Sequence, residues 1–142
     1  MTSQNISLAK VRKWNLPLTY KPKIESVKRG DCRQTIRMGR KFKEGDLVRF
    51  YIWKGKPYRS KRETITEYFL LREVWEIDIL PTGISTYDFT GYPHKFYTWV
   101  ELDWLARRDY ITPPTGEALR DVLIEKNGKT PDEGIEAQII RW

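Results

Sequence analysis

The chain has 142 residues, of which 39% are hydrophobic and 32% charged, a size and balance typical of one soluble globular domain. No stretch approaches the roughly 18 uninterrupted apolar residues of a membrane-spanning helix, and the charged N-terminal residues do not fit a signal peptide. We therefore expect a cytoplasmic protein without a membrane partner. One cysteine, Cys32, and one histidine, His94, are too few for a thiolate and imidazole zinc site, so the sequence predicts no structural metal and no cofactor.

Charge is distributed unevenly along the chain. Residues 1–62 contain 18 Lys and Arg against 4 Asp and Glu, whereas residues 63–142 contain 8 against 15. Clustered cations gain affinity for a polyanion because binding releases its condensed counterions. A solvated basic face is the alternative for any single run of cations, but interleaved aromatic residues favour stacking on unpaired bases. The sequence indicates a nucleic-acid partner, RNA in preference to DNA, and leaves open a barrel whose basic face meets an acidic protein.

The predicted RNA-binding surface lies within residues 33–62, where cations and aromatic side chains alternate. Its outer part is expected on a strand over residues 47–53 and on the exposed loop that follows the turn at residues 54–57. The predicted binding residues are Arg33, Arg37, Arg40, Lys41, Arg49, Tyr51, Trp53, Lys56, Tyr58, Arg59, Lys61 and Arg62.

The first elements are predicted from residues that begin or end helices and from the periodicity of apolar side chains. Residues 1–22 lack a clean period and are interpreted as an irregular N-terminal arm. Pro22 and Gly30 are placed to begin and end a helix over residues 23–29. The alternation of apolar and polar residues over 64–80 predicts one long, bent strand.

The remaining elements include two helices predicted from their ends. Thr98 and Glu101 form a capping-box pattern that precedes a helix ending near Arg108. A second helix is expected between Thr112-Pro113 and Asn127-Gly128. Further strands are predicted over residues 84–89 and 135–142, with a loop at 91–94 before residues 96–99. The fold class is α+β, mainly β, as a small antiparallel or mixed β-barrel with flanking short helices.

Two motifs in the first half of the chain resemble those of a known family. The turn Gly30-Asp31-Cys32-Arg33-Gln34-Thr35-Ile36-Arg37, followed by Lys43-Glu44-Gly45-Asp46, resembles the ASCH domain family of the PUA-like superfamily. The helix end over residues 105–111 and the last strand are similar to later family features in the same order. The resemblance covers residues 23–142 and implies a PUA-like barrel with a cleft that receives RNA or a modified nucleoside.

The resemblance also implies an alternative function, that of an ASCH-type hydrolase, either a ribonuclease or similar to an N4-acetylcytidine amidohydrolase. The family's threonine falls on Thr35, its acid on Asp109, and its lysine position on Cys32. From the residues, chemistry requires Thr35 activated by Asp109, or Cys32 with a pKa lowered by neighbouring arginines. The structural alternatives are a β-branched strand residue, a helix-end residue and a small buried thiol.

Overall fold

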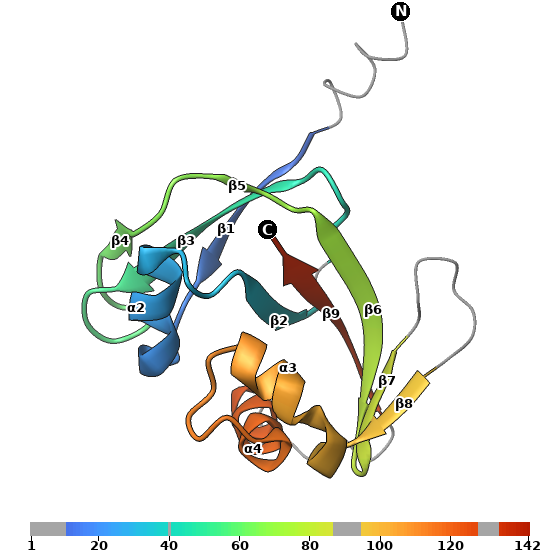
Figure 1. Ribbon diagram of the computed structural model, residues 1–142. Coiled ribbons are helices and arrows are strands. Elements are labelled where there is room, and N and C mark those ends of the chain that lie inside the picture. Colours follow the sequence, from blue (N-terminus) through green and yellow to red (C-terminus); the bar gives the residue numbers. More distant parts are fainter. Residues whose placement is uncertain (1–10, 40, 87–94, 128–133) are drawn as a thin grey trace, which may run out of the picture.

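The computed structural model describes residues 11–39, 41–86, 95–127 and 134–142. They form an α+β fold, mainly β, in which two sheets are flanked by helices (Figure 1). Within these ranges the strands do not close into a barrel. No helix in the described part of the chain is long and apolar enough to span a membrane.

The first sheet contains β1 (Lys13–Pro17), β3 (Leu47–Trp53), β4 (Arg62–Thr64) and β5 (Phe69–Leu70). The predicted strand over 47–53 is confirmed, with Phe50 fully buried. The interpretation of residues 1–22 as an irregular arm is wrong for β1, which pairs in parallel with β3 and places Leu16 opposite Phe50. A strand of five residues with only one fully buried side chain carries too little periodicity to be found from the sequence.

The second sheet has the order β2-β9-β6-β7-β8, and every pair in it is antiparallel. Its strands are β2 (Gln34–Met38), β9 (Ile135–Arg141), β6 (Glu73–Leu80), β7 (Gly83–Thr86) and β8 (Lys95–Thr98). The predicted last strand is confirmed as β9. The strand predicted over 84–89 is confirmed as far as Thr86, and the predicted loop at 91–94, with His94, lies outside the described residues.

The single strand predicted over residues 64–80 is wrong, because this segment is divided among β4, β5 and β6. It leaves the first sheet after β5 and joins the second with β6. The Leu71 N–H donates to the Asp46 carbonyl, and the next N–H, that of Arg72, donates to the Arg141 carbonyl. Only β6 buries side chains on one face, those of Ile77 and Ile79, whereas β4 is exposed throughout, so the alternation does not mark one continuous strand.

Helix α2 (Lys21–Arg29) confirms the first predicted helix. Pro22 lies in its first turn, where a missing N–H is tolerated. Gly30 ends it with φ 83°, a left-handed conformation that costs a residue with a Cβ. The chain then turns directly into β2, so the residues of this turn are held between a helix end and a sheet.

The capping box is confirmed at the start of η1 (Trp99–Leu102), which continues into α3 (Asp103–Arg108). The Thr98 N–H and hydroxyl both donate to Glu101 Oε1 at 2.9 Å, and these bonds lower the pKa of Glu101. Helix α4 (Gly116–Asn127) begins later than predicted, because Thr115 Oγ1, rather than Thr112, accepts a first-turn N–H.

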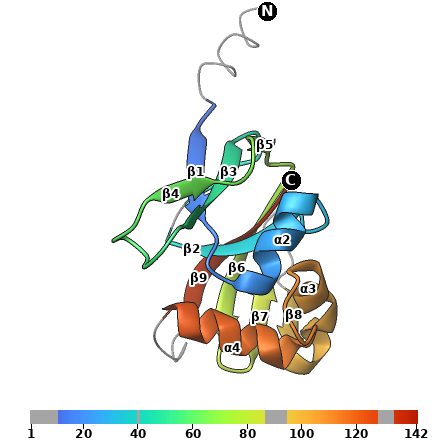
Figure 2. The ribbon, with the colours of Figure 1, turned by 90° about the vertical axis from the view of Figure 1, so that its left-hand side faces the viewer.

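Strand β9 joins the two hydrophobic cores of the molecule. Ile139 packs in the core that α3 and α4 share with the second sheet, and its neighbour Ile140 packs in the core beneath α2 and the first sheet. Both side chains are at most 2% exposed. The end of β9 therefore has a fixed position in the sheet, between β2 and β6 (Figures 1 and 2).

Candidate nucleic-acid interface

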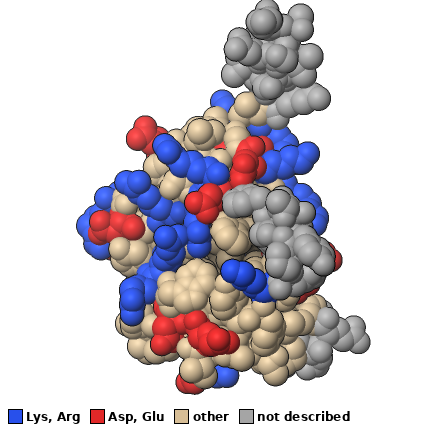
Figure 3. Space-filling view, turned by 45° about the vertical axis from the view of Figure 1, so that its right-hand side comes forward, with Lys and Arg blue, Asp and Glu red and all other residues tan. Residues whose placement is uncertain are grey.

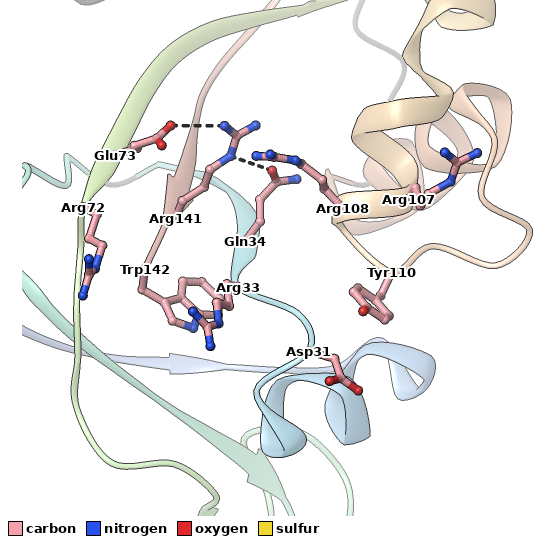
Figure 4. A pocket seen from close by; sticks show the side chains of 10 residues that line it. All are labelled: Asp31, Arg33, Gln34, Arg72, Glu73, Arg107, Arg108, Tyr110, Arg141 and Trp142. Atoms are coloured by element: carbon pink, nitrogen blue, oxygen red, sulfur yellow. Dashed lines mark hydrogen bonds and ion pairs between the residues drawn. The ribbon is translucent and has the colours of Figure 1, made fainter.

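A cleft of about 460 Å³ opens where the end of β9, the start of β6, the turn after α2 and the end of α3 meet (Figure 4). We call it the arginine cleft, because five of its ten lining residues are arginines. The lining residues are Asp31, Arg33, Gln34, Arg72, Glu73, Arg107, Arg108, Tyr110, Arg141 and Trp142.

The carboxylates of the arginine cleft neutralise few of its cations. Asp31 pairs with Arg29 at 2.9 Å, outside the cleft, and Glu73 pairs with Arg141 at 3.1 Å. Among the described residues, no carboxylate lies within ion-pair distance of the other four arginines, which are Arg33, Arg72, Arg107 and Arg108. Several guanidinium groups around one hollow repel each other unless an anion lies between them. The arginine cleft is therefore suited to bind an anion.

Arg141 is the most firmly held of these cations. Its Nε donates to Gln34 Oε1 at 2.9 Å, its Nη1 donates to Glu73 at 3.1 Å, and its guanidinium lies 5.6 Å from the Trp75 ring centre. Trp75 Nε1 also donates to Glu73 at 2.9 Å. That bond, followed by the nearby charge of Arg141, lowers the pKa of Glu73 against the opposing effect of its partial burial. Glu73 is thus kept ionised as the partner of Arg141.

A buried ion pair in the interior of the protein supports the position of Arg141. Lys23 Nζ lies 2.9 Å from Asp109 Oδ1, and the two residues are only 3% and 5% exposed. Gln34 Nε2 donates to the same Asp109 oxygen at 3.4 Å. A chain of polar contacts thus runs from helix α2 through Asp109 and Gln34 to Arg141 in the cleft.

The sequence interpretation missed Lys23 and Gln34. Lys23 lies four residues before the buried Val27, so the two share one face of α2, and a lysine on a buried face needs an anionic partner. Gln34 is two residues before Ile36 and so lies on the same face of β2. These spacings are the only signals in the sequence that pointed to either residue.

The three predicted catalytic residues are all buried. Thr35 is 4% and Asp109 5% exposed, and neither lines any described pocket. Cys32 is fully buried, and its thiol donates to the Gln34 carbonyl at 3.3 Å. Burial raises the pKa of Cys32 and outweighs the lowering effect of the Lys23 charge, so Cys32 lacks the lowered pKa that a nucleophilic role requires.

The predicted binding residues near the turn are dispersed. Arg33 lines the arginine cleft, whereas Arg37 donates to the Pro17 carbonyl at 2.7 Å and lies over the Phe50 ring at 5.9 Å. Arg40 is outside the described residues, and Lys41 lines a separate hollow. Of the described members of this group, Arg33 alone lines the cleft.

The other predicted binding residues form a second basic region, which we call the hairpin surface: Arg49, Tyr51, Trp53, Lys56, Tyr58, Arg59, Lys61 and Arg62. The β3–β4 hairpin that carries most of them projects away from α3 (Figures 1 and 2). Tyr58 is 83% exposed, whereas Tyr51, expected on the outside, is only 7% exposed. The Arg62 guanidinium covers Tyr51 at 4.5 Å and Trp53 at 5.2 Å.

Basic side chains form an extended band across one face of the molecule, with fewer acidic side chains among them (Figure 3). In the described ranges, no group of three or more His, Cys, Asp or Glu residues is placed to hold a metal ion. Comparisons with protein-family models, curated proteins and solved structures find no match to this chain. The ASCH resemblance accordingly stays a prediction from the sequence motifs.

Proposed function

We propose that this protein binds single-stranded RNA and that the phosphates of the RNA occupy the arginine cleft. The observation that supports this proposal most is that Arg33, Arg72, Arg107 and Arg108 line one cleft without carboxylate partners among the described residues. Guanidinium groups bind phosphate through paired, charge-assisted hydrogen bonds.

The shape and aromatic content of the cleft favour a single strand over a duplex. A hollow of about 460 Å³ has room for about one nucleotide of a single strand but not for a double helix. Trp142 lines the hollow and stacks on Phe69, with ring centres 5.7 Å apart and planes 5° apart, which fixes its orientation. Ordered aromatic rings beside cations are typical of proteins that bind unpaired bases.

The hairpin surface extends the proposed binding region. Its cations lie on a projecting loop with little apolar surface, and Trp53 and Tyr58 lie with ring centres 5.2 Å apart. A strand of RNA that leaves the cleft meets further positive charge along the basic face of the molecule.

We also infer a PUA-like relationship, with the present sheets as an open variant of the barrel. The inference is supported by the position of the cleft between β-strands and helices, with the Gly30 turn in its wall, as the ASCH resemblance implies. The PUA-like relationship is thus inferred from the order of the sequence motifs and from the position of the cleft.

Binding is tested by fluorescence anisotropy with a labelled single-stranded RNA. Replacing Arg107 and Arg108 by glutamine should weaken binding at least tenfold, since each contributes a charge-assisted phosphate contact. The matched control replaces Lys28 and Arg120, exposed cations outside the arginine cleft, and should leave affinity nearly unchanged. Equal losses in both double variants would contradict a specific role for the cleft, and tighter binding of polyglutamate than of RNA would favour an acidic protein partner.

A hydrolase is the second candidate, favoured by one observation. The family's lysine is missing from the turn, but Lys23 of α2 places an ammonium 2.9 Å from Asp109, the residue that matches the family's acid. Thr35, Lys23 and Asp109 are each at most 5% exposed, so a substrate could reach them only if the structure opened. We therefore expect no hydrolysis of N4-acetylcytidine by the purified protein. Steady turnover that is lost in Lys23→Met would establish the hydrolase instead.

A further inference from the structure

A second hollow, beside the arginine cleft, has a different chemical character. It has a volume of about 350 Å³, and its walls include the aromatic rings of Trp75, Tyr97 and Trp104. Arg108 and Arg141 line both hollows, so the two are neighbours. An aromatic chamber therefore adjoins a chamber suited to phosphate.

The aromatic rings are arranged to contact a flat ligand. Tyr97 and Trp104 meet edge to face, with ring centres 5.8 Å apart and planes at 73°, so the two rings form a corner. Trp75, on the neighbouring part of the sheet, is held by its bond to Glu73. Trp104 is 41% exposed, an unusual exposure for so large an apolar side chain at a hollow.

Among the described residues, the charged side chains that line this second hollow are cationic: Lys95, Arg108 and Arg141. Cations beside aromatic rings disfavour a positively charged ligand and favour one that presents hydrogen-bond acceptors. A volume of about 350 Å³ is near the lower end of the range for small-molecule sites, which fits one base with its sugar.

We propose that this second hollow receives one unstacked, uncharged nucleobase of the RNA, while the flanking phosphate lies in the arginine cleft beside Arg108. This inference rests on the proposed function and adds to it the position of a base. Arg141 then forms the boundary, because it lines both hollows and is held in place: it donates to Gln34 and to Glu73, and its guanidinium lies 5.6 Å from the Trp75 ring centre.

The test compares two labelled probes of equal length and charge by fluorescence anisotropy: a single-stranded RNA nonamer and its abasic counterpart, which keeps the ribose phosphates without bases. Stacking contributes about 1–3 kcal/mol per base, so the unmodified protein should bind the RNA at least fivefold more tightly than the abasic probe. Trp104→Leu should reduce that difference and leave binding of the abasic probe unchanged. Trp104→Phe should restore part of it.

The matched control is Phe96→Leu. Phe96 is 47% exposed and adjoins Tyr97 in β8, so its side chain points to the opposite face of the sheet, and it does not line the second hollow. It should leave both affinities unchanged. Thermal melting of each variant checks that folding is retained.

The outcomes separate the two proposals. If Trp104→Leu leaves the ratio of the two affinities as it is in the unmodified protein, the base-binding hollow is wrong, whereas RNA binding by the arginine cleft stands as long as the abasic probe binds. If neither probe binds the unmodified protein, both proposals fail.

Discussion

Gln34 Oε1 accepts a hydrogen bond of 2.9 Å from Arg141 Nε, and this contact joins the buried interior of the protein to its arginine cleft. The other end of the same amide donates to Asp109. The amide oxygen has a donor as its partner and the amide nitrogen has an acceptor, so these two partners determine the orientation of the Gln34 side chain. Gln34 is only 2% exposed, so water cannot replace either partner.

Gln34→Met keeps the length of the side chain and removes both hydrogen bonds. Leaving buried polar groups without partners costs about 1–3 kcal/mol, so we expect a lower midpoint of urea unfolding. RNA affinity should also fall severalfold, because Arg141 loses one of the two hydrogen bonds that orient it. An unchanged affinity in a correctly folded variant would show that Arg141 needs no support from Gln34.

The Lys23–Asp109 pair is expected to show strong coupling. Lys23→Met leaves a buried carboxylate without its cation and should destabilise the protein by about 3–5 kcal/mol. Adding Asp109→Leu removes the stranded charge and should recover part of this loss. Urea unfolding of the two single variants and the double variant measures the coupling. Additive losses would mean that the two charges do not depend on each other.

Cys32 should be unreactive in the native protein. Because burial raises the pKa of its thiol, the folded state binds the Cys32 proton more tightly than the unfolded state does. The stability that this adds is fully present below the ordinary thiol pKa of about 8.5 and is lost as pH rises through the raised pKa. Alkylation by iodoacetamide at pH 8 should be slow in buffer and fast in denaturant. Rapid alkylation of the native protein would contradict the burial of this thiol.

The hairpin surface should contribute to affinity but little to stability. Replacing Lys56, Arg59 and Lys61 together by alanine removes exposed charges from a loop with little apolar surface to bury. RNA affinity at low salt should fall, with a thermal midpoint within about a degree or two of the original. Arg62 is left in place because it covers Tyr51 and Trp53. If affinity is unchanged, RNA does not reach the hairpin.

Helix ends and single-sheet strands were predictable because their signals are local. Pro22 and Gly30 bracket α2, Thr98 and Glu101 cap η1, and the alternation over β3 marks both its limits. Strand β1 and the division of residues 64–80 were not predictable, since both depend on which distant strand pairs with each segment. Local periodicity indicates that one face of a strand is buried, but it does not indicate which sheet the strand joins.

The candidate site was predictable only in its overall charge. The excess of cations lies in residues 1–62, yet four of the five arginines in the cleft come from residues 72–141, where acidic residues outnumber basic ones. Arg141 lies near Arg33 because β9 pairs with β2, and the end of α3 adds Arg107 and Arg108 to the same cleft. Assembly of a site from separate parts of the chain follows from sheet order, which composition does not contain.

The salt dependence of RNA binding tests phosphate recognition by the arginine cleft most directly. Each phosphate contact on a single strand adds about 0.7 to the slope of log affinity against log salt, so four cleft arginines predict a slope of about −3 or steeper. Arg107→Gln with Arg108→Gln should reduce the steepness by about 1.4, whereas the Lys28 and Arg120 control variant should keep the original slope. A slope near zero for the unmodified protein, or one that the cleft substitutions leave unchanged, would contradict binding of RNA phosphates in the arginine cleft.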